Sequence, residues 1–453
     1  MKTALWSLGL ALGLAACGSD SGADAPTVGA SGAGGTASGG QAGAGEEGGT
    51  TASGAGGMPT GEEGGSGGAP PGACTSHADC AASPEGPRCD AISGQCAPLP
   101  PGHLIGWGDG SASSVELVVL YEPKTKREAT DLGFHPTRPN ELWVIQREYA
   151  SSETCTDSIS AGCASLEGSV NILFDPGTEA QKSVFKKDPN AWHFMRRPPA
   201  FAFGANDTMA TCGEERTGNY LDETVDYIGP ALFSTDLDIF AKQPPGKNGS
   251  HLDMLHETPW CMGIAHEKEN VYWAFNGKMG AIDRYDFKKD HGPGNEDHSD
   301  GELLRYGKGQ FKRLAGVPSH MKFSPDQKSI YIADTGNQRV ARLDATSGTQ
   351  GSNATPNLDG LQVAKLMKDV LIEDLVAPGQ LEAPSGLAVT ADTLYVSDNA
   401  TSKLHAFGLD GAPLRSLETN LPPGTLAGIT VGPDDKLYLV DKLTSRVYRL
   451  DPR

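Results

Sequence analysis

The last third of the chain repeats one short pattern, and this repeat limits the possible folds more than any other feature of the sequence. Each copy has a short strand that begins with a small or polar residue, a turn, and a second strand of the form Tyr-x-x-Asp. Apolar and polar residues alternate within these strands, which is typical of β-structure and not of helix. The clearest copies lie at residues 320–344, 385–399 and 427–441. Repeats of this length predict the blades of a β-propeller.

More degenerate copies begin near Asp131, Pro199 and Met262, which brings the expected number of blades to six. The last copy has three strands, at 428–431, 437–440 and 446–450, before the sequence stops. The strand-like segment 115–122 precedes the first copy and would supply the missing fourth strand, which removes a free sheet edge. We therefore expect an all-β fold over residues 104–453: a six-bladed β-propeller closed by an N-terminal strand.

The three clearest copies resemble the NHL-repeat β-propellers, and the resemblance covers roughly residues 115–453. It implies that the connections between blades and the second-to-third loops lie on one face, the top, and the other loops on the bottom. The architecture is also similar, more weakly, to the amidating lyases that cleave peptidyl-hydroxyglycines. That similarity implies a zinc ion held by three histidines near the central channel.

Residues 1–16 have the features of a secretion signal that ends in Leu14-Ala15-Ala16-Cys17, a sequence that resembles a bacterial lipobox. This implies that Cys17 is lipidated and anchors the chain in a membrane; an ordinary signal peptide with a chance Cys is the alternative. Gly18 resembles the sorting residue of outer-membrane lipoproteins. We therefore expect an outer membrane lipoprotein of a Gram-negative bacterium, on the periplasmic or cell-surface side.

Residues 17–73 hold more than a third of the 59 glycines and almost no large apolar side chains. Such a stretch cannot bury enough apolar surface to offset the entropy of ordering, so it is expected to be a disordered linker that follows the lipid anchor. The net charge of -20 argues against a nucleic-acid partner, which would need clustered Lys and Arg. No apolar run of 18 residues follows the N-terminus, which excludes a polytopic membrane protein. Outside the glycine-rich linker, where Gly-Gly-Ser-Gly-Gly occurs by composition, the sequence contains no Gly-x-Ser-x-Gly motif, and it contains no P-loop or His-Glu-x-x-His motif.

Eight cysteines remain after Cys17, an even number that predicts disulfides in an exported protein. The first four would close a small module at 74–99 with two bridges, in any of three connectivities; a zinc knuckle is the rival interpretation. The face assignment also predicts that the other four form two bridges on the top face. The cysteines are Cys74, Cys80, Cys89 and Cys96 in the module, and the predicted pairs Cys212 with Cys261 and Cys155 with Cys163.

Seven of the eleven histidines lie between residues 193 and 320. His193 and His256 each precede an expected inner strand by five residues, and His320 stands at the start of another. All three fall on the top face, with His251 close by. We expect their nitrogens within about 4 to 5 Å of one another around Zn²⁺ or a similar ion. The alternative is that each imidazole makes a hydrogen bond in its own loop.

Two further groups of carboxylates are candidates for supporting roles. Glu214 or Glu215 would be available to orient the imidazoles. The loop at 290–301, expected on the bottom face, offers oxygens for a second metal such as Ca²⁺ from Asp290, Asp297 and Asp300. It lacks the EF-hand spacing, so a capped, solvated turn is an equal alternative. The repeated Asp334, Asp398 and Asp441 are expected to form turns.

The sequence thus predicts a surface-tethered propeller with a metal-assisted lyase or hydrolase site at the top of the central channel. A bound ion there would polarise a substrate oxygen or activate water. The competing interpretation is a non-catalytic scaffold that binds a small molecule, peptide or protein on its top face, because fold alone does not fix function.

Overall fold

The computed structural model describes residues 72–90, 93–125, 127–147, 166–218, 225–295 and 297–453. The chain divides into two units, Met1–Gly68 and Ala69–Arg453, and all described residues belong to the second. The signal, the lipid anchor at Cys17 and nearly all of the linker therefore lie outside the described residues, as do Cys155 and Cys163. None of the helices in the described part has the length and apolar character that crossing a membrane requires.

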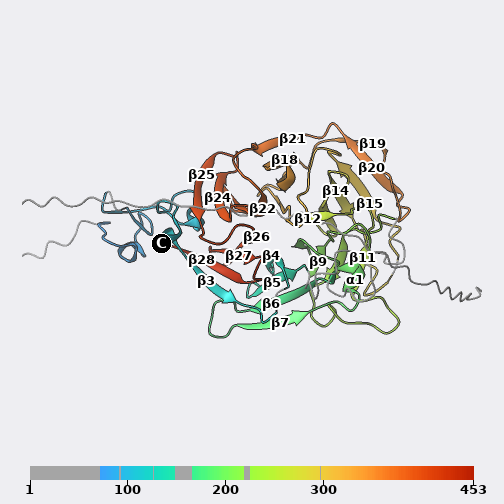
Figure 1. The fold of residues 1–453 in the computed structure, drawn as a ribbon, viewed down its shortest axis with the longest axis horizontal. Coiled ribbons are helices and arrows are strands. Elements are labelled where there is room, and N and C mark those ends of the chain that lie inside the picture. Colours follow the sequence, from blue (N-terminus) through green and yellow to red (C-terminus); the bar gives the residue numbers. More distant parts are fainter. Residues whose placement is uncertain (1–71, 91–92, 126, 148–165, 219–224, 296) are drawn as a thin grey trace, which may run out of the picture. The chain divides into compact units, whose positions relative to one another are not determined.

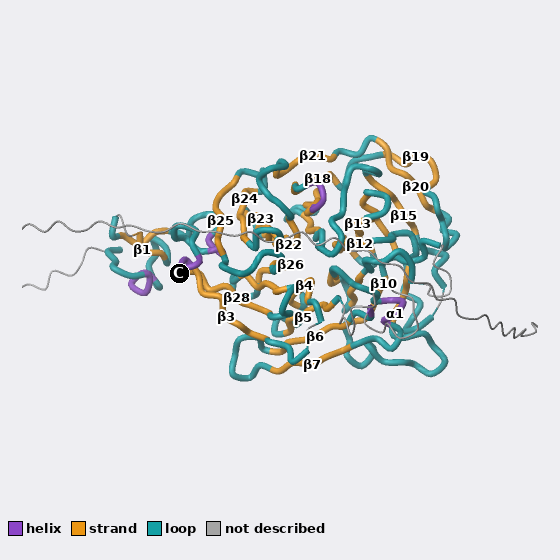
Figure 2. Tube along the Cα trace, viewed as in Figure 1, coloured by secondary structure: helices purple, strands orange, loops and turns teal. Residues whose placement is uncertain are grey.

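Six β-sheets are arranged around a central channel, which confirms the predicted propeller (Figure 1). Strands supply nearly all of the regular structure, as Figure 2 shows. Blade 1 contains β4 (Ala129–Phe134), β5 (Glu141–Gln146), β6 (Ser169–Phe174) and β7 (Lys182–Lys186). Blade 2 contains β8 (Phe201–Phe203), β9 (Thr208–Thr211), β10 (Ala231–Ser234) and β11 (His251–Met254). Blade 3 contains β12 (Cys261–Lys268), β13 (Val271–Asn276), β14 (Ala281–Asp286) and β15 (Glu302–Tyr306).

The remaining blades follow the same antiparallel order, with the inner strand first. Blade 4 contains β16 (Met321–Phe323), β17 (Ser329–Asp334), β18 (Arg339–Asp344) and β21 (Ile372–Val376). Blade 5 contains β22 (Pro384–Val389), β23 (Thr393–Asp398), β24 (Lys403–Gly408) and β25 (Pro413–Glu418). Blade 6 contains β26 (Leu426–Val431), β27 (Leu437–Asp441), β28 (Val447–Pro452) and β3 (Val115–Tyr121).

The ring closes as the sequence predicts, through the N-terminal strand β3. It pairs antiparallel with β28, with Leu117 opposite Leu450 and Val119 opposite Tyr448. The first and last strands of the propeller thus share one blade, which removes the open edge that blade 6 would otherwise have.

A hairpin inserted between β18 and β21 of blade 4 was not expected from the sequence. Its strands are β19 (Thr349–Asn353) and β20 (Val363–Lys368). Strand β20 pairs in parallel with β15, so the sheet of blade 3 grows to six strands. The insertion therefore attaches to the outer edge of the neighbouring blade.

The glycine and aspartate residues that recur in the repeat have structural roles. A Cβ on Gly263 would lie 2.0 Å from the backbone oxygen of Ser319, just before the next inner strand, so only glycine fits this close approach. Gly386 stands in the same relation to the backbone of Ala427. Asp398 accepts hydrogen bonds from the N–H groups of Ala400 and Thr401, and Asp441 from those of Leu443 and Thr444, which confirms the expected turn-forming role of these two carboxylates. Asp334 instead accepts from the N–H of Lys312 and from the side chains of Asn337 and Arg339.

The hydrophobic core lies between adjacent blades. In blade 4, Met321, Ile330 and Ile332 are fully buried and Phe323 is nearly so, as the alternation in the sequence predicts. These side chains pack against blade 3 residues such as Trp273. The inward-facing residues of each sheet thus stabilise the ring through its blade-to-blade contacts.

The disulfide module has too few apolar residues for a core of its own, and two bridges hold it together. Cys74 pairs with Cys89 and Cys80 with Cys96, which selects one of the three connectivities. Its regular structure is the 3-10 helix η1 (His77–Cys80) and the strands β1 (Arg88–Asp90) and β2 (Gln95–Ala97).

A third bridge joins Cys212 and Cys261, which confirms the predicted link between adjacent blades. The other short helices are η2 (His103–Ile105), η3 (Ala112–Ser114), η5 (Thr335–Asn337) and α1 (Ala191–Phe194). Of these, α1 lies beside the outer part of blade 2, where it contributes to the site described next (Figure 1).

Candidate functional site

A cavity of about 340 Å³ beside blade 2 gathers four of the eleven histidines. Its walls come from α1, from β11 and the connection that follows it, and from the loop between β14 and β15. The lining residues are Asn190, Trp192, His193, Phe194, Tyr227, Asn248, His251, His256 and His298. We call this cavity the histidine pocket.

Backbone carbonyl oxygens orient two of the four imidazoles. The Nδ1 atom of His193 lies 2.8 Å from the oxygen of Gly218, and that of His251 lies 2.8 Å from the oxygen of Asn248. Because a carbonyl oxygen only accepts hydrogen bonds, Nδ1 carries the proton in both rings. In the neutral ring, the lone pair is therefore on Nε2.

A buried carboxylate fixes the positions of these two histidines relative to each other. Asp188 accepts hydrogen bonds from the backbone N–H of Asn190, at 2.7 Å, and from the N–H of Ser250, at 2.8 Å. Asn190 precedes the short helix that carries His193, and Ser250 precedes His251. One side chain thus joins the two segments on either side of the pocket.

Carboxylates orient the other two imidazoles. The Nδ1 atom of His256 lies 2.8 Å from Oδ1 of Asp359, in the loop between β19 and β20. The Nδ1 atom of His298 lies 2.8 Å from Oδ1 of Asp253, in β11. Both carboxylates are almost wholly buried, with 3% and 0% of their side chains exposed. A carboxylate on the far nitrogen of an imidazole is a common arrangement behind metal-bound histidines.

The Nε2 atoms on the other side of the rings have no hydrogen-bond partner among the residues that the structure describes. The Nε2 atoms of His251 and His256 are buried and have no hydrogen-bond partner. For His193 and His298, the described residues show hydrogen bonds at Nδ1 only. A buried polar atom without a partner costs free energy, so each of these nitrogens is a candidate to bind a ligand.

The spacing of the rings matches ligands that share an ion. The ring centres of His193 and His256 are 5.6 Å apart, and those of His256 and His298 are 5.5 Å apart. With Zn–N bonds of about 2.0 to 2.1 Å, two imidazoles at a tetrahedral angle have centres about 5.2 Å apart. His251 lies at the edge of this set, 6.2 Å from His298.

The Nε2 atoms lie around the pocket, but they are too far apart to bind one ion as they stand. Among the described residues, three possible ligand atoms lie within 4.8 Å of one another only in two other groups, the module cysteines and Asp253 with His291 and Asp300. Holding one ion would therefore require the imidazoles to turn inward. Tyr227 stacks on His256 at 3.7 Å between ring centres and limits that turn to rotation within the ring plane.

Burial keeps most of these imidazoles neutral. It lowers the pKa of His193 to about 4 and that of His251 to about 3, and it lowers the pKa of His256 despite the opposing effect of Asp359. Burial acts in the same direction on His298, but the hydrogen bond and charge of Asp253 outweigh it and raise that pKa above its ordinary value of 6.5. Neutral imidazole is the form that binds a metal ion.

The structure brings together His193, His256 and His251 of the predicted top group but places His320 elsewhere. The Nε2–H of His320 donates to the oxygen of Pro199 at 3.2 Å, and its Nδ1 lies 3.5 Å from Oδ1 of Asp131. His320 stands at the start of an inner strand and faces the channel, whereas His193 and His256 lie on connections next to the outer strand β11. The expected approach of the three histidines to within 4 to 5 Å is therefore not found among the described residues.

His298 takes the place that His320 was expected to hold. Its loop was expected on the opposite face, but the loop runs along β11: the N–H of His291 donates to the oxygen of Leu252 at 3.2 Å, and the N–H of Gly294 to the oxygen of His251 at 2.7 Å. The fifteen residues between β14 and β15 are long enough to reach the pocket, which the alternation of faces did not take into account.

The acidic residues of the same loop separate into two groups. Asp290 accepts from the N–H of Gly292, and Asp297 accepts from the N–H and hydroxyl of Ser299, as in a capped turn. Asp300 instead lies 3.1 Å from Nε2 of His291, which also lies 3.8 Å from the buried Asp253. The three predicted ligands of a second ion thus do not share one site.

The orienting carboxylates are Asp253 and Asp359, not Glu214 or Glu215. Glu214 binds Arg147 and Arg313, and Glu215 binds Arg197. Asp253 could have been suspected from its position between His251 and His256. Nothing in the sequence indicated Asp359, because it arrives from an insertion more than a hundred residues away.

No protein-family model matches the chain, and no curated protein matches it either. Solved structures do match. An auxiliary nutrient binding protein from Bacteroides thetaiotaomicron has 12% identity and a TM-score of 0.44, over 72% of this chain and 69% of that chain. One from Bacteroides ovatus has 13% identity and a TM-score of 0.45, over 77% and 76%.

Virginiamycin B lyase from Staphylococcus aureus has 11% identity and a TM-score of 0.39, over 75% of this chain and 100% of that chain. These similarities concern the fold alone. The strand order and the ring closure define the class of this protein: it is a six-bladed β-propeller.

Proposed function

We propose that this propeller binds a divalent transition-metal ion, Zn²⁺ or a similar ion, through the Nε2 atoms of His193, His256 and His298, and uses it in a reaction of lyase or hydrolase type. One observation carries the proposal: four imidazoles around one cavity are each fixed through Nδ1 to an acceptor, and none has a protein partner at Nε2 among the described residues. Imidazoles that only stabilise a loop have no reason to share this arrangement.

The chain's own residues suit an open site. Three protein ligands leave a position for water or substrate, and an ion there would polarise a substrate oxygen or activate a water molecule. His251 is neutral at physiological pH, so the lone pair on its Nε2 could accept a hydrogen bond from a group in the pocket. Trp192 and Phe194 add apolar wall area that would limit access of bulk water to a small substrate.

The sequence supports a second part of the proposal, which concerns the location of the protein in the cell. We propose that Cys17 anchors the protein in the outer membrane through a lipid and that the glycine-rich linker holds the propeller away from the membrane. The disulfide between Cys212 and Cys261, next to the pocket, suits an oxidising compartment.

Metal analysis of protein purified without a histidine tag tests the site directly. The wild type is expected to retain about one Zn²⁺ per chain, and His256→Ala and His298→Ala to lose most of it. His320→Gln is the matched control: it also replaces a buried histidine, but one outside the pocket, and should keep the ion. Retention of the ion by both pocket variants, or loss in His320→Gln alone, would overturn the assignment.

Cobalt substitution separates an open catalytic site from a closed one. In Co²⁺-loaded protein, azide is expected to change the visible spectrum, because it can take a free coordination position. A spectrum that azide leaves unchanged in metal-loaded protein would indicate a closed, structural ion. In that case the non-catalytic binding scaffold becomes the better interpretation of the fold.

A further inference from the structure

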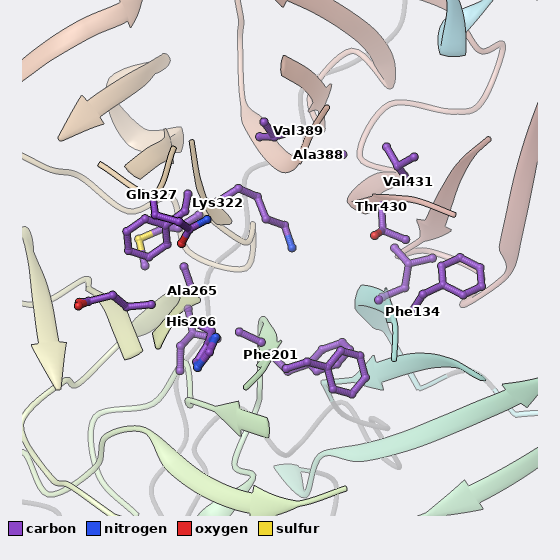
Figure 3. A pocket seen from close by; sticks show the side chains of 18 residues that line it. Phe134, Phe201, Ala265, His266, Lys322, Gln327, Ala388, Val389, Thr430 and Val431 are labelled. Atoms are coloured by element: carbon purple, nitrogen blue, oxygen red, sulfur yellow. The ribbon is translucent and has the colours of Figure 1, made fainter. Parts of the chain in front are cut away.

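The central channel contains a second cavity, of about 430 Å³, that is separate from the histidine pocket. The inner strands of all six blades line it, and none of its lining residues belongs to the histidine pocket. Gly133, Ala202, Ala265 and Ala388 are among its lining residues, and their small side chains leave the space open. Figure 3 shows the side chain of Lys322 reaching from blade 4 into this space.

Lys322 is the unbalanced charge in the channel. Within the described part of the chain, no hydrogen bond or ion pair involves its ammonium group. The one carboxylate in the lining, Glu267, is already neutralised by Arg284, at 2.7 Å, and accepts a hydrogen bond from Nε1 of Trp273. His266 uses its Nε2–H for the oxygen of Glu269. The ammonium group of Lys322 is therefore the one charge in the lining of this cavity that no described residue pairs with, in a chain whose formal net charge is -20.

Gln327 and Thr430 are the other polar side chains of the lining, and the remaining side chains are apolar. Phe134, Phe201 and Val431 are among the side chains around the space that Lys322 enters (Figure 3). Each inner strand has a neighbour on one side only, so its other edge turns backbone N–H and C=O groups toward the channel. Such a cavity offers one unpaired cation, several neutral hydrogen-bonding groups and a set of apolar side chains.

We infer that the channel binds a small carboxylate with an apolar body. Its carboxylate would pair with the ammonium group of Lys322, and its apolar part would lie against Phe134, Phe201 and Val431. A single cation matches a single negative charge, whereas a phosphate dianion would need further charged donors that the described lining does not supply. This site is independent of the metal proposed for the histidine pocket.

Isothermal titration with 2-naphthoate and its neutral amide, 2-naphthamide, tests the inference. The naphthalene ring probes the apolar wall in both, and only the carboxylate can pair with Lys322. Because a hydrogen bond to a charged group stabilises more than a neutral one, we expect the carboxylate to bind at least about tenfold more tightly. Equal affinities, or no measurable binding of either compound, would overturn the inference.

Three variants locate the binding. Lys322→Met keeps the length of the side chain but removes the charge and should lower the affinity for 2-naphthoate by about tenfold or more, to the level of the amide. Lys322→Arg should keep most of the affinity. Lys308→Met, which replaces an exposed lysine, is the matched control and should change nothing.

Two further outcomes bear on the inference. Naphthoate binding that survives in Lys322→Met would place the ligand elsewhere and refute the channel site. Removing metal with a chelator should leave naphthoate binding unchanged; if binding disappears with the metal, the ligand sits in the histidine pocket and the two proposals must be merged.

Discussion

Protonation of His320 is expected to destabilise the propeller, and the size of this effect can be calculated. His320 is wholly buried in the channel, between Pro199 of blade 2 and Asp131 of blade 1. Burial lowers its pKa below the ordinary value of 6.5; Asp131 acts in the opposite direction, and Lys322 adds to the lowering. In the unfolded chain the same imidazole has its ordinary pKa.

The linkage between proton binding and folding gives the direction of the change in stability with pH. Because the folded state holds this proton less tightly than the unfolded state, stability is fully present above pH 6.5 and is lost as the pH falls from 6.5 toward the lower folded pKa. Over that window the loss is at most about 1.4 kcal/mol for each pH unit. His320 is therefore expected to account for at most about 1 kcal/mol of the stability lost between pH 6.5 and 5.5.

The assay compares urea unfolding of the wild type and His320→Gln at pH 7.5, 6.5 and 5.5, with a chelator present so that metal binding does not contribute. Glutamine can still donate to the oxygen of Pro199 but cannot titrate. Other buried histidines affect both proteins equally, so only the difference between them is used. If the two proteins lose the same free energy on acidification, or if the variant loses more, the reasoning about His320 is refuted.

Three other predictions concern the blade contacts and the anchor. Replacing both Cys212 and Cys261 by Ala opens a loop of 49 residues and should lower the free energy of unfolding by about 4 kcal/mol, measured in urea; a loss below about 1 kcal/mol would contradict this. Gly263→Ala forces a Cβ to within 2.0 Å of the Ser319 oxygen and should cost about 2 to 3 kcal/mol or prevent folding; a wild-type melting temperature would argue against this steric account. Cys17→Ala should abolish labelling by radioactive palmitate and release the protein from membranes, and persistent labelling would exclude Cys17 as the lipidated residue.

The fold could be predicted from the sequence because its determinants are local and repeated. Several blades share the glycine of the inner strand, the Tyr-x-x-Asp strand and the alternation of apolar residues. Each copy of the repeat therefore strengthens the prediction for the others. Ring closure also followed, since blade 6 lacked one strand and Val115–Tyr121 was the available strand. The hairpin β19–β20 was missed because its first strand, Thr349–Asn353, has no apolar side chain and pairs through its backbone alone.

The candidate site could be predicted only in part. His193 and His256 were recognisable because they stand at equal offsets before two inner strands. His298 was assigned to the other face, since face alternation describes where a loop begins but not how far a long loop travels. His320 occupies a position that is glycine in blades 3, 5 and 6, and its side chain lies beside Pro199 and Asp131 of other blades, not beside the loops that carry His193 and His256.

The histidine pocket is assembled by departures from the repeat, and this explains why the repeat did not reveal it. α1 precedes blade 2, His298 comes from an extended loop of blade 3, and Asp359 comes from an insertion in blade 4 that is held in place by the pairing of β20 with β15. The channel, by contrast, is lined by the inner strand of every blade, and Lys322 is the one lysine in that lining. The regular part of the propeller thus supplies a channel cavity with one unpaired cation, and the irregular parts supply the imidazoles whose Nε2 atoms have no partner among the described residues. Ordering several insertions beside blade 2 costs conformational entropy, which a bound ligand would help to offset. Binding sites are also common in such loops, so the histidine pocket is the first place to look for a ligand.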